Sequence, residues 1–194
     1  MGVIFQSLGR TVTAGVALVI ILAITVGSGV SMGHAWGAFL MRWFHVLSGV
    51  MWIGLLWYFN FVQMPSMPKI PDEQKPAIGK VIAPAALFWF RWAALSTVVT
   101  GLILASMYPG YLNSMLTFAP GFRAIAIGMW LGLIMAFNVW FIIWPNQKKA
   151  LGIVQVDADA KAKAARVAML TSRFNTMLSI PMLYCMVAQQ NGGL

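Results

Sequence analysis

The sequence predicts an all-α integral membrane protein, a single domain over residues 1–194 built as a bundle of about five transmembrane helices. Hydrophobic residues make up 60% of the chain and charged residues only 9%, whereas about a quarter of the residues in a soluble domain are charged. The apolar residues form long runs, and the basic residues gather between some of these runs. Because backbone groups must pair internally in lipid, helices are favoured.

Five apolar stretches are long enough to cross a bilayer, which takes about 20 residues each. They cover residues 11–30, 38–63, 81–107, 122–144 and 167–188. The first follows Arg10 as a signal peptide would, but it is too long and lacks a clear cleavage pattern, so we expect a retained helix. The alanine-rich residues before 167 are expected to extend the fifth helix beyond the bilayer.

The distribution of lysine and arginine predicts the orientation. The connections 64–80 and 145–166 are basic, whereas the connections 31–37 and 108–121 contain no lysine or arginine. The positive-inside rule places the N-terminus in the cytoplasm and the C-terminus in the periplasm of a multi-pass protein of the bacterial inner (cytoplasmic) membrane. The net charge of +9 therefore indicates contact with the lipid bilayer rather than with nucleic acid.

Prolines mark the predicted ends of two spans. Four of them lie in the stretch FVQMPSMPKIPDEQKP, residues 61–76. They are expected to stop the second helix and to keep this connection extended as a lid or docking strip, and Pro145 is expected to stop the fourth helix. Gly128 and Gly132 in the fourth span form a small-xxx-small pair that indicates close helix packing.

Polar residues inside the spans are few and therefore informative, because they are costly in lipid and usually face the bundle interior. On the second span, a face of period three to four contains His45, Gly49, Trp52, Leu56, Asn60 and Gln63, and the opposite face with Val46, Ile53 and Phe61 suits lipid. Several spans direct polar groups toward the cytoplasmic half. This predicted inner cluster is the candidate substrate or anion site: Asn60, Gln63, Asn138 and Asn175, with Arg91 and Arg173.

No aspartate or glutamate lies within a span. Arg91 and Arg173 therefore need other partners, and a guanidinium pairs well with a carboxylate or phosphate. The alternatives are a haem propionate, a lipid phosphate, a planar organic oxoanion, or extension of the side chain to the lipid head groups. The same absence of buried carboxylates makes a coupled transporter the weakest function class.

His45 is the one histidine well inside a predicted span and is a candidate ligand of haem b iron. The alternative is an interior histidine satisfied by hydrogen bonds. On a continuous helix His34 would lie about 16 Å away, so the two could not share one iron. A single cysteine, Cys185, and the lack of a C-x-x-C-H motif exclude an internal disulfide, a four-thiolate zinc site and covalent c-type haem within this chain.

Four separated segments resemble one known family. They are MRWFHVLSGVMWIGLLWYFNFVQMP, PAALFWFRWAALSTVVTG, MAFNVWFIIWPNQKKALG and SRFNTMLSIPMLYCM. They resemble the membrane domain of the bacterial urate hydroxylase (PuuD) family over residues 38–188. The resemblance implies an oxidase-like membrane domain that gives electrons to a c-type cytochrome. It also implies that five residues are important for function: His45, Arg91, Asn138, Arg173 and Asn175.

Two functions remain open at this point. One is a membrane redox protein that binds haem b or an organic anion and passes electrons to a separate cytochrome or to quinone. The other is a non-catalytic accessory or assembly subunit of a larger, respiratory-type membrane complex. Other membrane subunits or a c-type cytochrome are the expected partners. The family's own cytochrome c has no counterpart in this sequence, and the first span has no counterpart in the family.

Overall fold

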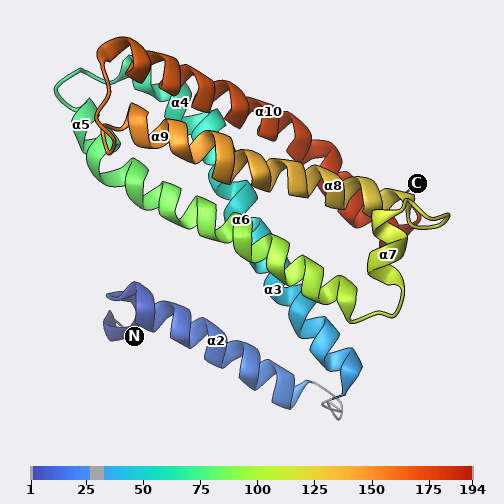
Figure 1. Cartoon of the computed structure of the whole chain (residues 1–194). Helices are drawn as coiled ribbons and strands as arrows, with labels where there is room; N and C mark the ends of the chain where they lie inside the picture. Colours follow the sequence, from blue (N-terminus) through green and yellow to red (C-terminus); the bar gives the residue numbers. More distant parts are fainter. Residues whose placement is uncertain (1, 27–32, 194) are drawn as a thin grey trace. The chain divides into compact units, whose positions relative to one another are not determined.

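The computed structural model describes residues 2–26 and 33–193, and this part of the chain forms helices and turns without a strand. It divides into two units, Met1–Leu40 and Met41–Leu194, which are described separately. Figure 1 shows the helices in chain order. The all-helical prediction is confirmed.

The first unit contains an N-terminal elbow. Helix α1 (Gly2–Phe5) meets α2 (Leu8–Thr25) at Ser7, whose backbone is extended. The Thr11 hydroxyl donates a hydrogen bond to the Ile4 carbonyl at 3.1 Å, and Arg10 Nη1 donates to the Val3 carbonyl at 3.2 Å. These bonds hold α1 against the start of α2. Residues 27–30 of the first predicted span lie outside the described residues.

The remaining elements follow in four helical stretches and one short connecting helix. The first stretch is α3 (His34–Trp57), η1 (Tyr58–Gln63), α4 (Met64–Ser66) and η2 (Met67–Lys69). The second is α5 (Lys75–Ala77), η3 (Ile78–Ile82) and α6 (Ala83–Ser106), followed by α7 (Tyr111–Leu116). The third is α8 (Arg123–Phe137), η4 (Asn138–Ile143) and α9 (Trp144–Ala150), and the fourth is α10 (Ala158–Asn191).

Four of the described helical stretches are long and apolar enough to cross a membrane, instead of the five predicted. They are Leu8–Thr25, His34–Lys69, Lys75–Ser106 and Arg123–Ala150. The predicted fifth span does form a helix, α10, which begins where Asp157 Oδ1 accepts a hydrogen bond from the Ala160 amide at 2.7 Å. Its packed face contains polar residues such as Ser172, Asn175 and Ser179, and these lower its hydropathy.

The prolines do not end the helices, contrary to the sequence prediction. The first stretch continues through Pro65 and Pro68 to Lys69, and the third continues through Pro145 to Ala150. Each of the π-helical segments η1, η3 and η4 ends two residues before a proline, namely Pro65, Pro84 and Pro145. Proline lacks an amide hydrogen and clashes with the carbonyl four residues earlier. We attribute the continuation of the helix to the wider π-turn, which moves that carbonyl aside.

The connection over residues 61–76 is therefore mostly helical rather than an extended strip. After Lys69 a short turn leads into α5. Within this turn Lys75 Nζ donates a hydrogen bond to Asp72 Oδ1 at 2.5 Å. This bond, together with the positive charge of Lys75, lowers the pKa of Asp72.

The core of the second unit forms where α3, η1, α6, η4 and α10 meet. Trp52 and Leu56 from the predicted inward face of α3 are 2% and 0% exposed, which confirms that face. Val46 and Phe61 are exposed as expected, but Ile53 is only 5% exposed, so its assignment to the lipid face is wrong. Ile53 lies three residues before Leu56 and therefore shares its face.

Helices α8 and α10 lie side by side (Figure 1) and pack closely against each other. A Cβ atom added at Gly128 would lie 3.2 Å from Cys185 Cβ and 3.3 Å from the Met186 backbone nitrogen. A Cβ atom at Gly132 would meet nothing within 4 Å. Only the first glycine of the predicted small-xxx-small pair is therefore required for the contact.

We expect Gly128→Ala to lower stability and Gly132→Ala to raise it. Overpacking a helix contact costs about 1–3 kcal/mol, and alanine gains up to about 1 kcal/mol over glycine in a helix. The midpoint of thermal unfolding in detergent should be lower than wild type for the first variant and equal or higher for the second. Equal midpoints for the two variants would contradict the close contact.

Candidate functional site

A buried amide pair joins the third stretch to α10. Asn138 Nδ2 donates to Asn175 Oδ1 at 2.8 Å, and Asn175 Nδ2 donates to the Met135 carbonyl at 2.9 Å. Asn138 is 7% exposed and Asn175 is fully buried. Both residues were predicted as site residues. They lie together, but their amides bond mainly to each other and to the backbone. Such bonds stabilise the contact between helices and leave few groups to bind a ligand.

A second set of hydrogen bonds joins α3 and η1 to α10. Asn60 Nδ2 donates to Ser172 Oγ and to the Leu56 carbonyl, each at 2.8 Å. Trp57 Nε1 donates to Ser179 Oγ at 2.9 Å. These bonds place the predicted Asn60 beside α10, while Asn60 Oδ1 is buried and has no hydrogen-bond partner among the described residues.

Arg91 lies apart from the amide pair. Its guanidinium carbon is 3.4 Å from the ring centroid of Trp144, the first residue of α9, so the two groups stack. Arg91 Nη1 is buried and has no hydrogen-bond partner among the described residues. The one ion pair in the described part of the chain joins Lys75 and Asp72, so no carboxylate there neutralises Arg91.

Further unpaired polar atoms lie around the stacked pair. Trp140 precedes Trp144 by four residues and Gln147 follows it by three, so both lie about one helical turn away. The indole nitrogen of Trp140 and Oε1 of Gln147 are buried without hydrogen-bond partners among the described residues. The Trp92 and Trp140 rings also meet edge to face, with centroids 5.6 Å apart. We call Arg91, Trp140, Trp144 and Gln147 the Arg91 site.

Gln63 in η1 adds one more unpaired acceptor. Its Oε1 is buried without a hydrogen-bond partner in the described residues, as is Asn60 Oδ1 three positions earlier. Their helix approaches α6 through Phe59 and Phe90, whose rings meet edge to face at 5.7 Å. Buried polar atoms of this kind normally have a partner, so their number here indicates a bound ligand or water.

His45 is a residue of α3, and its side chain contacts α6. Its Nδ1 is 2.8 Å from the Thr97 carbonyl oxygen, which can only accept a hydrogen bond, so Nδ1 is the donor. A Cβ atom at Gly101 would lie 2.8 Å from His45 Cε1, so glycine is needed where the imidazole packs. Within 2–26 and 33–193, no group of three or more His, Cys, Asp or Glu could hold a metal ion.

Arg173 is exposed on α10 and makes no hydrogen bond or ion pair to a described residue. The predicted residues therefore do not form one site. Asn138 pairs with Asn175, Asn60 contacts Ser172, Arg91 stacks on Trp144, His45 bonds to Thr97, and Arg173 points outward. Sequence reasoning missed Trp140, Trp144, Gln147, Ser172 and Gly101. The one-turn spacing from Trp140 to Trp144 and from Trp144 to Gln147 was a usable signal for three of them.

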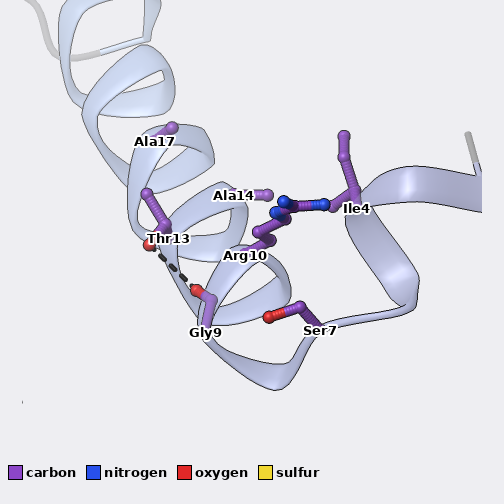
Figure 2. Close-up of a pocket in the computed structure, with 7 residues that line it drawn as sticks. All are labelled: Ile4, Ser7, Gly9, Arg10, Thr13, Ala14 and Ala17. Carbon is purple, nitrogen blue, oxygen red and sulfur yellow. Dashed lines mark hydrogen bonds between the residues drawn. The ribbon is translucent and has the colours of Figure 1, made fainter.

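Two surface cavities lie elsewhere than at these residues. One, of about 560 Å³, is at the N-terminal elbow, and Figure 2 shows its lining: Ile4, Ser7, Gly9, Arg10, Thr13, Ala14 and Ala17. The other, of about 370 Å³, is lined by residues of the connection after α6 and of α7, between Ser106 and Leu116. None of the predicted site residues lines either cavity.

Comparison with known proteins gives one match. The family model described as urate oxidase N-terminal matches residues 112–192, which is less than half of the chain. No curated protein and no solved structure matches. The matched range includes Asn138, Trp140, Trp144, Gln147 and Asn175 but not His45 or Arg91. From within α7 to the end of α10, the chain is therefore similar to a family related to urate oxidation.

Proposed function

We propose that this chain is a membrane-embedded protein of urate oxidation and that the Arg91 site binds a planar organic anion of the urate class. The observation that carries the proposal is the buried, unpaired Nη1 of Arg91, whose guanidinium is stacked on Trp144. A guanidinium in this state matches a carboxylate-like or enolate oxygen. The similarity of residues 112–192 to urate oxidase N-terminal supports the ligand class.

The other unpaired atoms define the ligand further. Arg91 Nη1 and Trp140 Nε1 are donors and require acceptors on the ligand. Gln147 Oε1 is an acceptor and requires a donor on the ligand. A ring that carries both carbonyl and N–H groups and a negative charge meets these requirements. A simple carboxylate or a phosphate offers no N–H group.

Urate binding to the purified full-length chain tests this proposal. Arg91→Gln is expected to weaken binding about 10- to 100-fold, because a hydrogen bond to a charged group contributes about 1.5–3 kcal/mol. Arg166→Gln removes an exposed arginine of α10 and should bind urate as wild type does. The measurement is equilibrium binding of radiolabelled urate in detergent micelles. Absence of saturable binding, or equal affinity of Arg91→Gln and wild type, would overturn the proposal.

Oxidation of such a ligand also needs an electron acceptor. The membrane redox form of the proposal uses haem b, quinone or a separate c-type cytochrome as that acceptor. Urate-dependent reduction of a c-type cytochrome by membranes that contain the chain, lost in Arg91→Gln, is the expected result. Binding without cytochrome reduction would retain the ligand site and remove this acceptor.

A second candidate function is an accessory subunit of a larger membrane complex. Arg173 favours it, because this arginine is exposed on α10 among exposed apolar residues such as Phe174 and Met177. An exposed cation on such a face is suited to a partner subunit. Purification at fixed stoichiometry with other membrane subunits, without urate binding, would support this function over the first.

A further inference from the structure

A polar seam runs along the contact between α3 and α6 in the second unit. Ser48 and Ser96 share a hydrogen bond of 2.8 Å on the exposed side of this contact. Thr100 donates to the Ser96 carbonyl at 2.6 Å, and His45 lies beside them on α3. Polar groups at the surface of a membrane span are costly unless something covers them. The seam is therefore a candidate binding surface.

The hydrogen bond of His45 determines which nitrogen can bind a ligand. Because Nδ1–H donates to the Thr97 carbonyl, the neutral imidazole has its lone pair on Nε2. Nε2 makes no hydrogen bond within the described part of the chain. Metal-binding histidines are commonly oriented by this kind of Nδ1–H to carbonyl bond. His45 is thus prepared as a Lewis base at Nε2.

A cation lies one turn from this base. Arg42 precedes His45 by three residues on α3, so the two side chains are neighbours on the helix. Arg42 Nε is buried and has no hydrogen-bond partner among the described residues. The four acidic residues of the chain all lie outside α3, α6 and α7.

The seam therefore needs a ligand that offers a Lewis acid to Nε2 and a negative charge to Arg42. Haem b has both, since its iron takes an imidazole nitrogen and its propionates pair with arginine. A quinone has carbonyl acceptors, which do not match a nitrogen lone pair. We propose that the α3–α6 seam binds haem b, with His45 Nε2 as an axial ligand and Arg42 paired with a propionate. This proposal does not rest on urate binding at the Arg91 site, although it would provide that site with an electron acceptor.

Haemin titration of the full-length chain in mild detergent tests this assignment. Wild type is expected to develop a Soret band that saturates at about one haem per chain, and the band should be absent in His45→Gly. Added imidazole should restore the band in His45→Gly, because it can replace the missing ligand. A purely structural role of His45 would not produce this rescue.

Two further variants test whether haemin binding depends on Arg42 and on His45 in particular. Arg42→Gln should keep the Soret band but bind haemin about 10-fold more weakly, as expected for the loss of one charged contact. His34→Gly removes the other histidine and should bind as wild type. No saturable Soret band in wild type, or equal binding by His45→Gly without imidazole, would overturn the proposal. Neither outcome bears on urate binding, which is measured without haemin.

Discussion

Asn175→Leu is expected to be among the most destabilising single substitutions in the described part of the chain. Asn175 is fully buried and bonds both Asn138 Nδ2 and the Met135 carbonyl. Leucine would leave the Asn138 side-chain donor buried and unpaired, at about 1–3 kcal/mol. It would also remove one of the two hydrogen bonds to the Met135 carbonyl, whose other donor is the Asn138 backbone amide. We therefore expect a loss of about 2–5 kcal/mol and a fall in Tm of about 5–15 °C.

Asn146→Leu is the matched control for this substitution. Asn146 lies in α9 and donates only to the Ile142 carbonyl in its own helix, at 2.8 Å. Its replacement breaks no contact between helices, so the Tm should change by only a few degrees. The double variant Asn138→Leu/Asn175→Leu should be less destabilised than the sum of the single variants. A Tm of Asn175→Leu equal to that of Asn146→Leu would contradict the importance of the amide pair.

Gly101→Ala is expected to weaken haemin binding strongly while leaving the fold intact. The new Cβ would lie 2.8 Å from His45 Cε1 and 3.0 Å from Nδ1, so the imidazole must turn away from Thr97. Loss of the hydrogen bond costs about 1 kcal/mol, and alanine gains up to about 1 kcal/mol over glycine within α6. The two effects nearly cancel in stability. The displaced Nε2 no longer faces the ligand position.

The measurement is haemin affinity together with Tm. Gly54→Ala is the control, since a Cβ there meets nothing within 4 Å and should leave haemin binding unchanged. We expect the affinity of Gly101→Ala to fall at least about 10-fold with a Tm within a few degrees of wild type. Wild-type affinity in Gly101→Ala would show that the imidazole position is irrelevant to the ligand.

Hydropathy and helical period correctly predicted those features of the fold that depend on the burial of apolar side chains. The apolar runs predicted the helices, and the spacing of Trp52 and Leu56 predicted the packed face of α3. The prediction failed at Ile53, because the packed face is wide enough to include a residue three positions from Leu56. Hydropathy marks α10 less clearly than the other helices, because its polar residues Ser172, Asn175 and Ser179 are buried against neighbouring helices.

Local rules also misjudged the prolines. Proline usually ends a helix because it lacks an amide hydrogen and clashes with an earlier carbonyl. Before Pro65 and before Pro145 the helix contains a π-helical segment, and beyond these prolines the two helices continue to Lys69 and to Ala150. The proline-rich connection was therefore expected to be an extended lid, whereas most of it is the end of one helix and the beginning of the next.

The sequence by itself determined the helical class, the long apolar stretches and the short set of polar residues within them, because apolar length and the cost of burying charge are local properties of the chain. It also identified Arg91 as a cation without an acidic partner. Only the tertiary structure decided which groups meet: Arg91 with Trp144, Asn138 with Asn175, and His45 with Thr97 and Gly101. These pairs are tens of residues apart, and their contacts depend on how whole helices pack.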